Sequence, residues 1–207
     1  MKIIEPKVEF ITPIDGDVVM KRLELIGRVC YKSEDKITDD SAEKFLRNII
    51  RRGHESILEH CSFTVRFTVD RGVSHEIVRH RMASYAQEST RYVKYDEVTF
   101  IKPCYLEADT PAYNAWHAAM YVAEKSYRRM IDHGSTPQQA RAVLPTSTKT
   151  ELIMTANIRE WRHFLRLRCS KAAHPQMREV AMQLLGMCVE TMPVLFEDVW
   201  REVEENC

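Results

Sequence analysis

Nine residues, CSFTVRFTV at positions 61–69, restrict the folds open to this chain more than any other segment. Their side chains alternate in steps of two, and β-branched and aromatic residues dominate, which predicts a strand with one buried face. The segments at 148–157, 8–12 and 97–103 have the same strand character. The sequence therefore predicts an α+β fold, with a small central sheet of three or four mainly antiparallel strands covered by helices.

Helices are expected where apolar residues recur at helical spacing. Their predicted ranges are 17–31, within 39–55, 71–80, 110–134, 136–145, 158–169 and 174–205, the last being a long C-terminal helix. Asp17 is a candidate N-cap of the first helix, and Gly53 gives a C-terminal signal for the second. Because no repeat, linker or low-complexity tract interrupts this pattern, residues 1–207 are expected to form a single domain.

Composition excludes several classes of protein. The 30 basic residues balance the 30 acidic ones, which argues against a nucleic-acid-binding protein, since such domains are usually basic. No window of about 18 apolar residues occurs, so no membrane segment is expected. The cysteines show no CxxC pair, which favours a reduced cytoplasmic protein in which most of them are small core residues. They are Cys30, Cys61, Cys104, Cys169, Cys188 and Cys207.

The segment SHEIVRHRMASYAQESTRY at 74–92 concentrates arginines in a chain without net charge. In a helix, Arg79 and Arg81 would point about 200° apart, so either the helix ends there or the two arginines serve different ligands. Arg91 follows the hydroxyl-bearing Ser89 and Thr90. Because guanidinium forks and hydroxyl groups suit phosphate oxygens, the segment predicts a site for a phosphorylated ligand.

Other chemistries find less support. His75 and His80 are five positions apart, and His54 and His60 are six apart, so neither pair has the i, i+4 spacing of a zinc protease, and no metal is expected. No G-x-S-x-G motif occurs. The alternative is a non-catalytic nucleotide- or RNA-binding module, which predicts exposed aromatic residues for stacking. The aromatic residues here fall mostly at core-like helical spacing, as Trp161 does.

Four ordered segments together resemble the flavin-dependent thymidylate synthases. Residues 79–81 and Ser89 match the family signature R-H-R-x7-S. Upstream, RRGHESILEH is similar to the family segment before its central strand, and ARAVLP, TAN and FLRLRC follow in the family's order. The resemblance spans Cys30 to about Gln176, and it implies an α+β homotetramer with sites between subunits. The implied cofactor is FAD, with NADPH as the reductant, and the implied reaction methylates dUMP to dTMP with carbon from methylenetetrahydrofolate.

The resemblance also implies a role for each matching residue. Cofactor binding falls to Ser56, Arg79, His80, Arg81, Gln87, Asn157, Arg159 and His163, with His54 and Glu59 nearby. Substrate binding falls to Glu76, Arg79, Gln87, Glu88, Ser89, Thr90, Arg91, Arg141 and Arg168. Arg168 is the expected catalytic residue, because a permanent cation beside the pyrimidine would polarise C6 toward hydride attack. The chain departs from residues common in the family at Cys30, Glu76, Ala86, Gln87 and His163.

Overall fold

The computed structural model describes residues 1–11 and 13–205, and these residues form two compact units. Unit 1 contains residues 1–8, 66–79 and 85–153. Unit 2 contains residues 9–65, 80–84 and 154 to the end of the described chain. The chain therefore passes between the units several times. No described helix is both long and apolar enough to cross a membrane.

The main sheet has four antiparallel strands, as the sequence predicted. Its order is β2 (Lys7–Phe10), β3 (Ser62–Asp70), β6 (Lys149–Asn157) and β4 (Ala83–Gln87). Each of these strands has residues in both units. In β3 the buried positions alternate, with Phe63, Val65, Phe67 and Val69 on the covered face, and β6 alternates in the same way. The predicted strand at 8–12 corresponds to β2, and its last residue, Thr12, lies outside the described residues.

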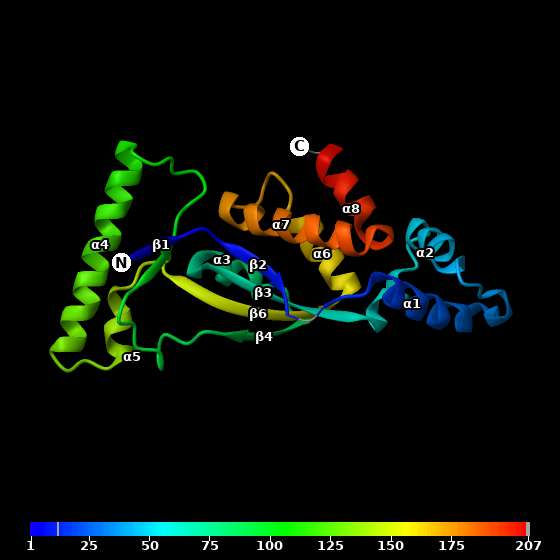
Figure 1. Ribbon diagram of the computed structural model, residues 1–207, viewed down its shortest axis with the longest axis horizontal. Coiled ribbons are helices and arrows are strands. Elements are labelled where there is room, and N and C mark those ends of the chain that lie inside the picture. Colours follow the sequence, from blue (N-terminus) through cyan, green and yellow to red (C-terminus); the bar gives the residue numbers. More distant parts are fainter. Residues whose placement is uncertain (12, 206–207) are drawn as a thin grey trace. The chain divides into compact units, whose positions relative to one another are not determined.

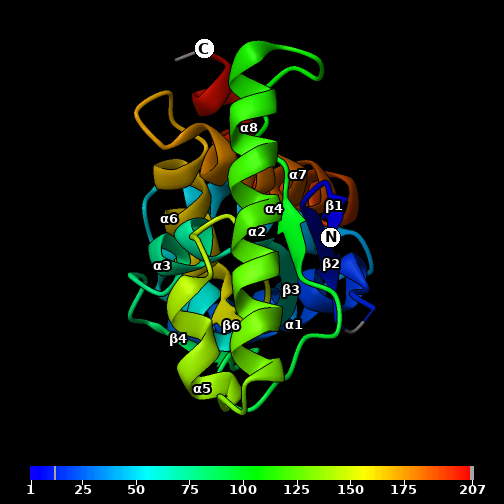
Figure 2. The same cartoon turned by 90° about the vertical axis from the view of Figure 1, so that its left-hand side faces the viewer.

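Unit 1 also has a parallel pair of strands, β1 (Lys2–Ile4) and β5 (Thr99–Ile101). Its helical elements are α3 (Arg71–Ile77), α4 (Pro111–Asp132), α5 (Pro137–Ala140) and the short η3 (Arg141–Val143). Figure 2 shows α4 along its whole length, with α5 near its lower end. Phe100 of β5 packs with Met120 and Tyr127 of α4 and with Ala140 of α5 in one buried cluster. This cluster ties β5 and both helices together.

Unit 2 contains the remaining helices. They are α1 (Gly16–Tyr31), η1 (Glu34–Lys36), α2 (Ser41–Arg51), η2 (Glu55–His60), α6 (Ile158–Arg168), α7 (Pro175–Thr191) and α8 (Pro193–Glu205). Figure 1 shows α1 beside α2, and α6 beside α7 and α8. The rings of Trp161 and Phe63 stack with centroids 5.0 Å apart, and Phe196 of α8 meets Phe63 edge-on. Trp161 is fully buried, as its helical spacing predicted.

Several predicted boundaries were wrong. Helix α3 ends at Ile77 and not at residue 80, and the strand β4 lies in a segment for which no strand was predicted. The N-cap of α1 is Asp15, whose side chain accepts a hydrogen bond from the Val18 N–H at 3.0 Å, and not Asp17. The expected C-terminal helix is divided into α7 and α8, because Pro193 has no N–H and its ring cannot continue a helix.

The predicted short helix at 136–145 is shorter than expected and has two parts, α5 and η3. Sequence reasoning missed β1 and η2. Among the described cysteines, Cys61, Cys169 and Cys188 are buried as expected, whereas Cys30 and Cys104 are exposed. Cys207 lies outside the described residues. Gly53 has a φ of +71° after the end of α2, which confirms the predicted C-terminal glycine.

Candidate active site

In unit 2, His80 links the last turn of α6 to an acidic side chain. His80 follows α3 in the sequence and is buried, and its Nε2 accepts a hydrogen bond from Nε of Arg168 at 3.1 Å. Its Nδ1 lies 3.1 Å from Oε1 of Glu160, two turns earlier on α6. The three side chains therefore form a hydrogen-bonded chain from Glu160 through His80 to Arg168.

The partners of His80 determine where its proton lies. A guanidinium group can only donate, so Nε2 must be the accepting nitrogen and Nδ1 carries the proton that it donates to Glu160. Burial lowers the pKa of His80 below its usual 6.5, and the charge of Arg168 adds to this effect, while the hydrogen bond with Glu160 opposes it. At neutral pH, His80 is therefore a neutral ring that holds Arg168 in one orientation.

Sequence reasoning identified His80, His163 and Arg168 but missed Glu160. The rings of His80 and His163 lie with centroids 5.7 Å apart, so the structure brings together two of the predicted cofactor residues. Glu160 precedes His163 by three positions on α6, which places both on one face of that helix. That spacing was the signal available in the sequence, although nothing there indicated that His80 would face it.

Other predicted cofactor residues line a cavity of about 410 Å³ in unit 2. Asn157 ends β6 and caps α6, since its Oδ1 accepts a hydrogen bond from the Glu160 N–H at 2.9 Å. Arg159 is half exposed, and its Nη1 donates to Oε1 of Glu59 at 2.5 Å. His163 and Glu55 also line the cavity. Amide, guanidinium and imidazole donors thus face one hollow.

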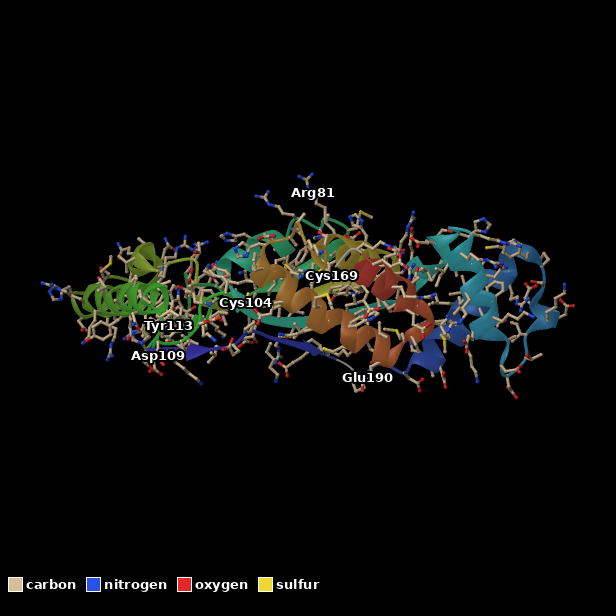
Figure 3. The ribbon with its side chains drawn as sticks, turned by 90° about the horizontal axis from the view of Figure 1, so that it is seen from above. Arg81, Cys104, Asp109, Tyr113, Cys169 and Glu190 are labelled. Atoms are coloured by element: carbon tan, nitrogen blue, oxygen red, sulfur yellow. The ribbon has the colours of Figure 1, made fainter. Side chains whose placement is uncertain are left out.

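The donors of unit 2 fit the polar groups of a flavin. The Asn157 side chain uses its oxygen for the helix cap, which leaves its amide N–H groups for a ligand. The exposed Arg159 and His163 can turn toward a bound molecule, and Ser56 of η2 is exposed as well. Figure 3 shows the side chain of Arg81 projecting away from the ribbon, in keeping with its exposure. This set could hold part of an FAD molecule.

The predicted nucleotide residues gather in unit 1, apart from Arg168. Nη1 of Arg141 donates to Oγ1 of the buried Thr90 at 3.3 Å. Nε of Arg91 donates to Oε1 of Gln138 at 3.0 Å, and its backbone N–H donates to Oγ of Ser89 at 3.3 Å. Two cations and two hydroxyl groups therefore lie on neighbouring segments. Gln138 was not predicted, because nothing in the sequence connects α5 with residues 89–91.

Gln87 and Glu88 hold the end of β4 in place. Nε2 of Gln87 donates to Oγ of Ser74 at 2.9 Å, and the Glu88 carboxylate accepts from Tyr95 at 2.7 Å and from Lys149 at 3.0 Å. Burial of Lys149 opposes its charge, but its hydrogen bonds to Glu151 and Glu88 outweigh burial and raise its pKa. With Ala86 offering no polar side-chain atom, these neighbours position the strand end.

The remaining predicted residues of unit 1 lie at the end of α3. Glu76 is partly buried on this helix, and its carbonyl oxygen accepts a hydrogen bond from the Arg79 N–H at 3.2 Å. Arg79 is exposed and lies after the helix, whereas Arg81 belongs to unit 2. Of the two alternatives for this segment, the first is therefore confirmed: the helix ends before the arginines.

Comparisons with known proteins identify the family to which this chain belongs. The family described as "Thymidylate synthase complementing protein" matches residues 19–194. A flavin-dependent thymidylate synthase of Geobacter sulfurreducens is 36% identical over 183 residues, covering 84% of this chain and 79% of that protein. One of Pyrococcus furiosus is 39% identical over 166 residues, covering 77% and 67%.

One solved structure is similar to this chain over nearly the whole length of both. It is the UMP/dUMP methylase PolB of Streptomyces cacaoi bound with 5-Br dUMP, which superimposes with a TM-score of 0.78 at 28% identity. The match covers 95% of this chain and 96% of that one. Since the family match extends over residues 19–194 and relatives above 30% identity cover most of the chain, this protein belongs to the flavin-dependent thymidylate synthase (Thy1) family.

Proposed function

We propose that this protein converts dUMP into dTMP, with methylenetetrahydrofolate as the carbon donor, FAD as the cofactor and NADPH as the reductant. Membership of the family supports the reaction class. The observation that carries the assignment of roles is the chain from Glu160 through His80 to Arg168. It fixes one guanidinium group, on the arginine that the sequence resemblance aligns with the pyrimidine.

The phosphate of the nucleotide would bind to unit 1. Arg91 and Arg141 supply permanent positive charges, and Ser89 and Thr90 supply hydroxyl groups. The partners of both arginines are neutral, namely Gln138 and Thr90, so a phosphate dianion can replace them without leaving a buried acid unpaired. This arrangement favours a monophosphate over an uncharged nucleoside.

Arg168 would act on the base. A planar guanidinium group beside N3 and a neighbouring carbonyl of uracil withdraws electron density from the ring and makes C6 more electrophilic. The neutral His80 holds Nε of Arg168, and Glu160 holds His80, so the orientation of the guanidinium is set before the substrate arrives. No cysteine nucleophile is needed in this scheme.

Unit 2 would hold the flavin through the amide of Asn157, through Arg159 and His163, and through Ser56 and Arg81. When bound, the flavin would supply the hydride and receive electrons from NADPH. The protein's own task is to place cationic and amide donors beside a cofactor that gains negative charge on reduction. Residues 1–207 would work as one catalytic domain, assembled into a homotetramer.

An anaerobic assay tests the proposal. Purified protein with FAD, NADPH, methylenetetrahydrofolate and dUMP should form dTMP, and omission of the folate should abolish the product. UMP should be assayed beside dUMP, since PolB is described as a methylase of both. A folded, flavin-loaded protein that methylates neither nucleotide would reject the proposed reaction, and methylation of UMP alone would correct the substrate.

A further inference from the structure

Two histidines and one glutamate in unit 2 lie close enough together to hold a single metal ion. His80, Glu160 and His163 each offer one ligand atom, and the three atoms lie within 4.8 Å of one another. Zinc binds imidazole nitrogen and carboxylate oxygen at about 2.0–2.2 Å, which puts neighbouring ligands of a tetrahedral ion roughly 3.3 Å apart. Nδ1 of His80 and Oε1 of Glu160, 3.1 Å apart, are already near this spacing.

His163 can complete the set without a change of backbone. It is exposed and lies one turn after Glu160 on α6, so its side chain can change rotamer freely. To bring all ligand atoms to tetrahedral spacing, its ring must approach by roughly 1–2 Å, which is within the reach of a side-chain rotation. His80 is buried and fixed, so it supplies the rigid part of the site.

We propose that His80, Glu160 and His163 form a binding site for a divalent transition metal ion, with Zn²⁺ the best fit. Two imidazoles and one carboxylate are a ligand set that zinc accepts, with a fourth position left for water. Glu160 and His163 line the cavity of about 410 Å³, which gives the ion access and leaves room for the fourth ligand. The observations that support the metal site do not depend on the proposed reaction.

Metal binding has a consequence for Arg168. Coordination at Nδ1 of His80 displaces the proton of that nitrogen, and the proton moves to Nε2 of the neutral ring. A protonated Nε2 cannot accept the hydrogen bond from Nε of Arg168, so that bond is lost. If the proposed function holds, Zn²⁺ therefore inhibits the enzyme by releasing Arg168 and by occupying the cavity expected to hold flavin.

Calorimetric titration of the full-length protein with Zn²⁺, after removal of flavin and metals, tests the site. The variants are His163→Asn and Glu160→Gln, and the matched control is His133→Asn, which removes an exposed histidine at the end of α4. We expect one ion per chain in the wild type and in His133→Asn. Loss of a ligand in His163→Asn should weaken binding by more than the roughly 10- to 100-fold that loss of an outer-shell partner costs.

The variants separate this site from other binding of zinc. Binding to exposed thiols such as Cys30 and Cys104 would persist in His163→Asn. Equal affinities in the wild type and His163→Asn would overturn the proposal, as would no binding to the wild type or a loss shared with His133→Asn. Flavin-loaded protein should bind Zn²⁺ more weakly than flavin-free protein. Equal Zn²⁺ affinity of the two forms would show that the metal and the flavin do not share a site, and it would leave the metal site itself unaffected.

Discussion

At the scale of single residues, the hydrogen bond between Arg168 and His80 decides how the guanidinium group is presented. A lysine at position 168 could still donate to Nε2 of His80, but it would lose the planar fork and its fixed direction. Arg168→Lys should therefore fold and retain FAD, while kcat for dTMP formation falls by about ten- to a hundredfold, the effect of one lost charge-assisted hydrogen bond. Flavin absorbance measures the retained FAD, and an anaerobic assay measures kcat. Turnover of Arg168→Lys at the wild-type rate would remove Arg168 from the mechanism.

Asn157 has two separable roles, since its oxygen caps α6 and its amide group is free to donate to flavin. Asn157→Asp keeps the capping oxygen and removes the amide donors, so we expect nearly unchanged stability and about tenfold weaker FAD binding. Asn157→Ala removes both and should also lower the free energy of unfolding by about 1 kcal/mol. Urea unfolding and FAD titration of both variants distinguish the roles; if Asn157→Asp binds FAD normally, the amide does not contact the cofactor.

Arg91 should serve the nucleotide and not the flavin. Because its present partner, Gln138, is neutral, Arg91→Ala leaves no buried acid unpaired. We expect dUMP to bind about ten- to a hundredfold more weakly, with FAD affinity unchanged. Arg128→Ala, an exposed arginine of α4, is the matched control and should change neither affinity. An equal loss of both ligands in Arg91→Ala would contradict the division of roles.

The sequence identifies candidate residues of the site, but it does not identify the contacts that these residues make. A motif identifies Arg79, His80 and Arg81 because they are contiguous, and Arg168 because its segment matches the family. No motif identifies the partners that orient these side chains. Glu160 is 80 positions from His80, and only the fold brings the two side chains to 3.1 Å.

At the scale of elements, a buried arginine connects α6 to α8. The side chain of Arg162 is 0% exposed, and its Nη1 and Nη2 donate to both oxygens of Asp198 at 2.8 and 2.6 Å. Asp198→Ala would leave a buried charge poorly compensated and should lower the free energy of unfolding by about 3–5 kcal/mol.

The control Glu202→Ala removes an exposed partner of Arg166 from the same helix, and it should lower the free energy of unfolding by no more than about 1 kcal/mol. Urea unfolding at pH 7 compares them; similar losses would show that the connection is not specific.

The ion pair between Arg162 and Asp198 also predicts how the stability of the protein depends on pH. Burial opposes ionisation of Asp198 and is the largest influence, but the hydrogen bond from Arg162 and the charges of Arg162 and Arg166 together outweigh it and lower its pKa below 3.8. The unfolded chain therefore binds this proton at higher pH than the folded chain, so the stabilisation is complete above pH 3.8 and is lost as the pH falls through the lowered pKa. The stability difference between wild type and Asp198→Ala should shrink over that range in urea titrations; a constant difference would contradict the prediction.

The sequence predicted the elements whose hydrophobic residues recur at a regular spacing, and it did not predict the elements that lack such a spacing. β3 and β6 each bury alternate residues, and both were found within one residue of their true ends. β4 has the sequence ASYAQ and no buried residue, so no alternation marks it, and its place at the edge of the sheet depends on pairing with β6. The helical spacing of hydrophobic residues continues through Met192 into α8, and for this reason the break at Pro193 was not predicted.

At the scale of the whole molecule, the remaining prediction is the assembly. Tyr121 and Val122 of α4 are 48% and 60% exposed, an apolar surface that a second copy of the chain could cover. We expect a particle of about four times 24.2 kDa by light scattering. Val122→Glu should lower the mass and release FAD, because a charge buried between chains is costly and because the sequence resemblance implies sites between subunits. The control Lys44→Glu changes an exposed charge on α2 instead, and it should leave the mass and the FAD content unchanged. A Val122→Glu tetramer would exclude this face from the interface, and a wild-type monomer that retains FAD would exclude sites shared between subunits.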